Sequence, residues 1–301
     1  MNRISLLVLP LAFSFSLAGC RDDNGSTTPV NSHDMSATSD GSVPGSTDMA
    51  VPVGAATTIA SARSAAVRTS ITVTAIVTAV HGDSEWYVQD PAGGPWSGID
   101  VFCNKSAKKN PCPASLVTPM VGDKVSITGV ISPYKGKDEL DPAAQTTMAS
   151  GGTTMPPVTT VSTTDASAAS AKPELRGILV NVTPSATPWT VDDVMPAALI
   201  NTTACPTSTD ADGGCLMCLP PQYSGFEVTD GTTKLFVYNY FYGASHLTSS
   251  PECLTSATTN VPVTTSTTFT ALGGILDVDP YAPTANTVVL SPTSDSAYTI
   301  K

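Results

Sequence analysis

The feature that most constrains the fold is a strict alternation of apolar and small polar side chains. Residues 71–80 read Ile-Thr-Val-Thr-Ala-Ile-Val-Thr-Ala-Val. A repeat of two is the side-chain period of a β-strand, and β-branched residues favour strands. No interval of the sequence has a helical repeat longer than two turns, so the pattern predicts an all-β protein.

Similar short segments follow, each bounded by turn-forming residues. Gly82 and Gly122 mark two of the breaks, and a Pro-Ala-Gly-Gly-Pro run at 91–95 marks another. The first module is therefore predicted to have five strands, at residues 71–80, 85–89, 98–102, 124–131 and 134–140.

The same order of segments then recurs after a Ser/Thr/Ala-rich interval. The matching segments are residues 175–182, 225–231, 234–238, 268–276 and 287–290. This recurrence predicts two copies of one five-stranded module.

The N-terminus has the three parts of a secretory signal. Arg3 precedes an apolar run at residues 4–15, which is too short to span a bilayer, and small residues follow it. The ending Leu17-Ala-Gly-Cys20 resembles the lipobox of bacterial lipoproteins. The resemblance implies that residues 1–20 form a lipoprotein signal region that is cut before Cys20, so that Cys20 is the first mature residue. It also implies a diacylglyceryl thioether on Cys20 and usually an acylated amine, for example by palmitate. An unlipidated secreted protein is the alternative.

Sorting rules of that family imply an outer-membrane location, because Arg21 and not an aspartate follows Cys20. Residues 21–66 are rich in Ser, Thr, Pro and Gly and are predicted to be a disordered tether. Such a spacer reaches about 35–40 Å. No second stretch approaches the ~20 apolar residues of a membrane span, so the lipid is expected to be the only anchor, in the envelope of a Gram-negative bacterium.

Charge and cysteine content narrow the partners and the compartment. The chain has 14 Lys and Arg against 25 Asp and Glu, a net charge of −11, which argues against nucleic acid as a partner.

Apart from Cys20, six cysteines remain, and an even number in an exported chain predicts disulfides. We expect a local Cys103–Cys112 bond and favour Cys205–Cys215 with Cys218–Cys253 among three possible pairings of the other four. A zinc site using Cys215 and Cys218 is the weaker alternative.

The two modules resemble oligonucleotide/oligosaccharide-binding (OB) folds. The resemblance is carried by Trp86-Tyr-Val-Gln-Asp-Pro-Ala-Gly-Gly-Pro-Trp-Ser-Gly98, by Val121-Gly-Asp-Lys-Val-Ser-Ile-Thr-Gly-Val130, and by their counterparts at 226–231 and 272–276. It implies two tandem Greek-key barrels, at residues 67–160 and 173–301, joined by a linker at 161–172. A pair of β-sandwich modules is the alternative.

The sequence has little that indicates catalysis. His33 falls in the tether, while His81, beside Asp83, Ser84 and Glu85, and His246 are expected on exposed turns. No phosphate-binding loop, paired-histidine metal motif or nucleophile elbow is present. Asp210 and Asp212, followed by glycine, form part of a calcium-loop pattern without its closing Glu, so no cofactor or metal is predicted.

An aromatic stretch offers the best candidate for binding. Tyr238, Tyr240 and Tyr242 share one face if residues 236–242 form a regular strand. Such a stripe could stack on sugars or bases, or it could fill the barrel core. We expect a non-enzymatic, membrane-anchored lipoprotein that binds a partner protein or an envelope glycan. The alternatives are an enzyme or accessory subunit of a secreted hydrolase system, marked by a pocket gathering His81 or several carboxylates, and a structural spacer.

Overall fold

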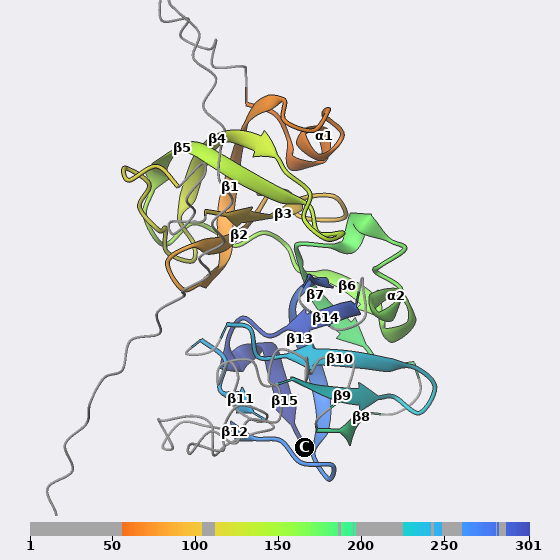
Figure 1. The fold of residues 1–301 in the computed structure, drawn as a ribbon. Helices are drawn as coiled ribbons and strands as arrows, with labels where there is room; N and C mark the ends of the chain where they lie inside the picture. The colour runs from red at the N-terminus through yellow and green to blue at the C-terminus, as the bar shows by residue number, and fades with distance from the viewer. Residues whose placement is uncertain are drawn as a thin grey trace, which may run out of the picture. The chain divides into compact units, whose positions relative to one another are not determined.

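The computed structural model describes residues 56–103, 112–185, 188–194, 196, 225–241, 244–248, 261–280, 282 and 287–301 (Figure 1). These residues are mostly β-strand, and their two α-helices have five residues each. The predicted all-β class is confirmed. Among these described residues, no helix has the length and apolar character needed to cross a bilayer.

Five strands of the first module close into a barrel in the order β1-β2-β3-β5-β4. Every neighbouring pair is antiparallel except β3 and β5, which run parallel. This is the Greek-key ring of an OB fold, not the two facing sheets of a sandwich. The strands are β1 (Ser70–His81), β2 (Glu85–Gln89), β3 (Gly98–Phe102), β4 (Lys124–Ile131) and β5 (Glu139–Ala149).

The fifth strand begins later than the sequence predicted. Tyr134 and Lys137 exchange backbone hydrogen bonds of 2.8 and 2.9 Å across a two-residue turn, so residues 134–137 form their own small hairpin. Lys135 has φ 46° and Gly136 has φ 87°, the positive values that such tight hairpin turns require. The turn fixes the position of Lys137 just before β5.

The folded part of the chain begins before residue 67. Helix α1 (Ile59–Arg63) is capped by Thr58, and Ile59 is fully buried in the first core. The backbone N–H of Ile59 donates to the Asp90 carboxylate at 3.0 Å. Buried Ile59 and Ala62 pack this short helix on the barrel together with the bond to Asp90, although the surrounding composition resembles the tether.

The second module repeats the pairing of the first. Strand β13 pairs with β7, β8 and β14; β8 pairs with β9, β9 with β10, and β10 runs parallel to β14. Strands β7 and β8 together occupy the place of β1, which confirms the predicted internal repeat. The strands are β7 (Ile178–Thr183), β8 (Trp189–Asp193), β9 (Gly225–Thr229), β10 (Lys234–Tyr238), β13 (Thr268–Asp279) and β14 (Thr287–Ser291).

Elements beyond the five-strand pattern extend this second sheet. Strand β6 (Thr159–Ser162) pairs in parallel with β7, and β15 (Tyr298–Ile300) pairs with β13. The interval predicted to be a linker is folded, because Val161, Ala166 and Ala169 lie in the second core. The remaining short elements are α2 (Thr163–Ser167), η1 (Pro173–Leu175), β11 (Leu247–Thr248), β12 (Val261–Pro262) and η3 (Asp295–Ala297).

Candidate functional site: a buried charge cluster between the modules

Strand β2 is buried on both of its faces. Trp86 and Val88 point into the first core, as the alternation predicts. Glu85, Tyr87 and Gln89 point the other way, yet none is more than 5% exposed. The outer face of strands 2 and 3 is where OB folds usually bind ligands. In this protein the second module covers that face.

Direct contacts show how closely the second module covers it. The backbone N–H of Leu179 in β7 donates to Gln89 Oε1 at 3.0 Å. The Tyr87 ring meets Phe241 edge-on, with centroids 5.8 Å apart. Ala79, Leu179 and Ile275 complete this small apolar cluster between the modules.

Two glycines allow the backbones of the modules to touch. A Cβ atom added to Gly98 would lie 2.0 Å from the carbonyl oxygen of Gly177. Gly177 also has φ +74°, a conformation that other residues rarely adopt. Beside this contact, the Arg63 guanidinium donates to the carbonyl oxygens of Pro173, at 2.8 Å, and Arg176, at 3.2 Å.

At the centre of the covered face, Lys137 lies between two carboxyl groups. Its Nζ is 2.8 Å from Glu85 Oε1 and 2.7 Å from Asp100 Oδ2. The three side chains are 4%, 7% and 0% exposed, respectively. Lys137 Nζ also lies 5.0 Å from the centre of the Tyr87 ring, a cation–π distance.

The second module closes the cluster with Tyr240. Its hydroxyl donates to Glu85 Oε2, and its ring lies 4.0 Å from the His81 ring. His81 Nδ1 is 3.6 Å from Glu85 Oε2. The sequence predicts an exposed turn at His81, with Asp83, Ser84 and Glu85 nearby. In the structure His81 is the last residue of β1, and Glu85 is only 5% exposed, because the second module covers it.

Burial and mutual charge set the protonation of the three central groups. Burial raises the pKa of Glu85, but the Lys137 ammonium and hydrogen bonds outweigh it and hold that pKa far below its usual range. Burial and the Glu85 charge raise the pKa of Asp100 well above its usual value. Burial lowers the pKa of Lys137, but Asp100 and Glu85 raise it further. These shifts favour a Glu85 carboxylate and a Lys137 ammonium, and of the two carboxyl groups Asp100 is the one that more readily holds a proton.

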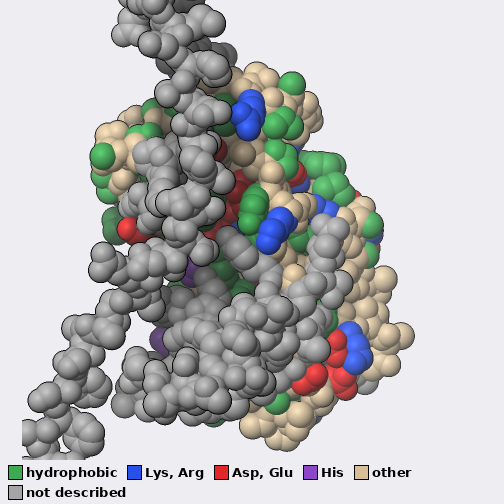
Figure 2. Space-filling view, viewed as in Figure 1, with side chains coloured by type: hydrophobic (Ala, Val, Ile, Leu, Met, Phe, Trp, Pro, Cys, Tyr) green, Lys and Arg blue, Asp and Glu red, His purple; other side chains and the backbone are tan. Residues whose placement is uncertain are grey.

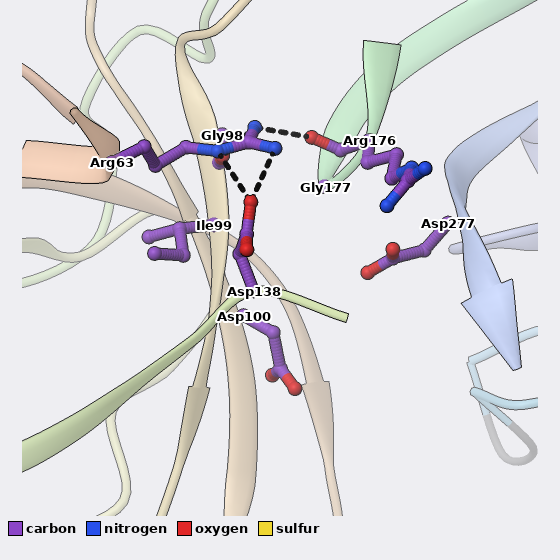
Figure 3. Close-up of a pocket in the computed structure, with 8 residues that line it drawn as sticks. All are labelled: Arg63, Gly98, Ile99, Asp100, Asp138, Arg176, Gly177 and Asp277. Carbon is purple, nitrogen blue, oxygen red and sulfur yellow. Dashed lines mark hydrogen bonds and ion pairs between the residues drawn. The ribbon is translucent and has the colours of Figure 1, made fainter. Parts of the chain in front are cut away.

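A small hollow, partly open to solvent, lies beside this cluster, and it has no room for a water molecule (Figure 3). Arg63 donates to Asp138 at 2.9 Å, and the Asp277 carboxylate extends from β13 toward Arg176 in Figure 3. Burial raises the pKa of Asp277, whose Oδ1 accepts the backbone N–H of Val278 at 2.8 Å. Within the described residues, no His, Cys, Asp or Glu cluster has the geometry of a metal site. The lining residues are Arg63, Gly98, Ile99, Asp100, Asp138, Arg176, Gly177 and Asp277.

The predicted aromatic stripe is not one regular strand. Strand β10 ends at Tyr238, which is 8% exposed, and Tyr240 lies in the following turn. The two rings lie 5.9 Å apart, and Tyr240 reaches across to Glu85. Tyr242 lies outside the described residues.

Of the other residues that the sequence singled out, the structure describes one cysteine pair and His246. Cys103 and Cys112 form the expected disulfide, with Cα atoms 5.1 Å apart. His246 Nδ1 lies 2.5 Å from Asp295 Oδ2, and Asp295 Oδ1 also accepts the Tyr298 hydroxyl at 2.6 Å. The remaining predicted residues lie outside the described part of the chain: Cys20, His33, Cys205, Asp210, Asp212, Cys215, Cys218 and Cys253.

No sequence pattern predicts Lys137, Asp100 and Asp277 as site residues. No spacing pattern connects them, because the cluster depends on strand register and on docking of the second module. The one available signal was the polar face of β2, with Glu85, Tyr87 and Gln89 at alternate positions. By itself, that pattern indicates a solvated face.

Comparisons with known proteins add little to this picture. No protein-family model and no curated protein matches the chain. Among solved structures, the chain is similar to one described as "Structure of the hypothetical protein ygiW from E. coli", at 23% identity and a TM-score of 0.25. The match covers 32% of this chain and 94% of that one. The fold assignment therefore rests on the strand pairings themselves.

Proposed function

We propose that the protein is a non-enzymatic lipoprotein of the cell envelope whose two OB-like modules act together as one binding unit. Its partner would be a protein or an envelope glycan. The anchor rests on the Leu17-Ala-Gly-Cys20 motif. The observation that carries the binding role is the use of the outer β2 face of the first module to hold the second module. Partner binding then falls to the corresponding face of the second module.

That corresponding face is formed by the outer side of β8, β9 and β10. Lys234 Nζ lies 2.6 Å from Glu227 Oε1 and also contacts Asp192. Figure 2 shows acidic and basic side chains gathered over this region. Phe236 is half-buried on the same side of β10 as Lys234. A ring beside fixed polar groups is a chemistry that suits a sugar or a polar peptide.

The test is retention of envelope proteins and binding to a glycan array, using the chain without its first twenty residues. A double variant, Phe236→Ala with Lys234→Glu, should lose the bound partner. Lys124→Glu, which changes the same charge on the first module, should keep it. Equal binding by both variants would contradict the assignment to this face. No retained partner for the wild type would contradict the binding role.

A second candidate function rests on the hollow lined by Asp100, Asp138 and Asp277. Several carboxylates around a concavity are what a hydrolase or its accessory subunit would need, but this hollow would have to open before it could admit a substrate. In the observed geometry Asp138 is paired with Arg63 and Asp277 accepts a backbone N–H. Hydrolysis of glycan or ester substrates that is lost in Asp138→Asn would favour this alternative over the binding module. A structural spacer is the third possibility, and it predicts neither a partner nor an activity.

A further inference from the structure

We propose that the side chains of Lys137 and Asp100 join covalently, forming an amide bond between β3 and the turn that precedes β5. Glu85 is the residue that moves the protons for this reaction. This bond is a modification of the protein by its own residues and needs no partner.

The distance between the reacting groups is the first support. Lys137 Nζ lies 2.7 Å from Asp100 Oδ2, but the two are not aligned as a hydrogen bond. Asp100 Oδ1 has no hydrogen-bond partner within the described residues, although it is fully buried. An amine beside a carboxyl group, off the axis of an aligned hydrogen bond, is close to the near-attack geometry that amide formation needs.

The fold holds each group on a rigid element. Asp100 pairs with Tyr87 across β2–β3 and with Glu139 across β3–β5. Lys137 is fixed two residues before Glu139 by the tight turn at Lys135 and Gly136. Register therefore brings Lys137 and Asp100 together wherever the barrel closes, and no rearrangement is needed.

The surroundings exclude water, which favours the amide over its hydrolysis. Lys137, Glu85 and Asp100 are at most 5% exposed as whole residues. Tyr87 lies on one side at 5.0 Å from Nζ to the ring centre, and Tyr240 lies at 6.0 Å. Removal of solvent also strengthens the electrostatic interactions among the fixed groups of the site.

Proton transfer from Lys137 to Glu85 begins the reaction. The Glu85 carboxylate, which accepts a hydrogen bond of 2.8 Å from the Lys137 ammonium, is the group placed to take its proton and leave a neutral amine. This transfer is uphill, because the pKa of Glu85 is lowered and that of Lys137 is raised, so the neutral amine is a short-lived species. The amine attacks Cγ of Asp100, whose raised pKa favours the protonated carboxyl group. A second amine proton passes through Glu85 to the departing hydroxyl.

Atoms and protons balance in this reaction. The Nζ–Cγ bond forms and the Cγ–O bond breaks, with one water molecule released. Of the three protons on the ammonium and one on Asp100, one stays on the amide, two leave in water, and one remains on Glu85. Nothing is oxidised or reduced, and no co-reactant is required. Intramolecular placement of this quality is worth an effective concentration on the order of 10⁵–10⁸ M.

The experiment is peptide mass spectrometry of the full chain purified from its envelope, after denaturation, reduction, alkylation and trypsin digestion. In the sequence, Asp100 falls in the tryptic peptide of residues 69–105. A linked Lys137 resists trypsin, so it should appear in the peptide of residues 136–176, joined to 69–105. The expected product is this branched pair, lighter than the sum of its parts by one water. Recovery of the wild type as the separate linear peptides, with cleavage after Lys137, would overturn the proposal.

Substitutions distinguish a covalent Lys137–Asp100 bond from an ordinary ion pair. Lys137→Arg cannot form the bond and should give only linear peptides. Glu85→Gln keeps the size of the side chain but cannot take the proton, so the branched product should fall at least tenfold. An undiminished product in Glu85→Gln would overturn the role of Glu85. Lys234, an exposed lysine also placed between two carboxylates, is the internal control and should be cleaved normally. Because the wild-type digest decides the main question, a variant that fails to fold leaves the test intact.

Discussion

Gln89 Oε1 accepts the backbone N–H of Leu179 at 3.0 Å, which joins β2 of the first module to β7 of the second. The same amide group donates from Nε2 to Ser97 Oγ at 3.0 Å. Gln89 is fully buried, so this single side chain satisfies polar groups in both modules.

Replacement of this glutamine should therefore be costly. Gln89→Leu leaves the buried N–H of Leu179 without a partner, which should lower the free energy of unfolding by about 1–3 kcal/mol. Urea denaturation measures this change in the free energy of unfolding. Gln145→Leu, at a partly exposed position bonded to Val117 O, is the matched control and should change stability by less than about 0.5 kcal/mol. Similar losses in both variants would contradict a special role for Gln89.

The close contact at Gly98 gives a steric prediction. Gly98→Ala places a methyl group 2.0 Å from a backbone oxygen that cannot rotate away, so the modules must separate locally. We expect a loss of about 1–3 kcal/mol or more, as for an overpacked core. Gly82→Asn is the control, because its added side chain meets open space and Asn tolerates positive φ. Thermal melting of the two variants should differ clearly, and equal melting temperatures would argue against the contact.

Tyr240 is expected to stabilise the fold. Tyr240→Ala removes the ring packed on His81 and the hydroxyl bonded to Glu85, which should cost about 2–5 kcal/mol. Tyr240→Phe removes only the hydroxyl and should cost about 1.5–3 kcal/mol, the range for a hydrogen bond to a charged group. The measurement is thermal melting beside a glycan array. Unchanged stability with weakened glycan binding would instead support a ligand platform at this tyrosine.

Glu139 should make stability depend on pH. Burial raises its pKa from the ordinary 4.5 to about 7, an effect that Lys137 partly offsets. The folded protein then holds a proton that the unfolded chain releases, so stability from this group is present below pH 4.5 and is lost as pH rises through 7. If Lys137 lost its charge, the pKa of Glu139 would rise further, and stability would still fall as pH rises.

The check is the free energy of unfolding at pH 5 and at pH 7.5 in urea. The wild type should lose stability over this interval, and Glu139→Gln, which carries no titrating proton, should lose less. Buried Asp100 and Asp277, whose pKa values are also raised, contribute in the same direction and remain in both proteins. An identical loss in wild type and variant would refute the assignment to Glu139.

The lipid anchor has its own test at Cys20. Cys20→Ser removes the sulfur that would carry the thioether, so the variant should take up no labelled fatty acid and should accumulate as precursor. Cys103→Ser, which removes a cysteine of the folded module, should still be labelled. Equal labelling of Cys20→Ser and wild type would contradict the anchor.

The sequence by itself determined the strands and their repeat. Alternation and β-branched residues located β1 to β4 and the core of β13, because a strand's side-chain period is a local property. The Cys103–Cys112 bond followed from short separation alone. Helix α1 and the interval at 161–172 were misassigned, since their small residues resemble a spacer until a core is available to bury Ile59 or Val161.

Only the tertiary structure decided the site. Glu85, Asp100 and Lys137 are distant in sequence and become neighbours through barrel closure and the register of β2, β3 and β5. Whether the outer face of β2 meets water or protein depends on the docking of a second module through Gly98 and Gly177, which no periodicity encodes. Burial then changes the protonation of the same carboxyl groups, because the free energy of a charge depends on the solvent around it and not on its place in the chain.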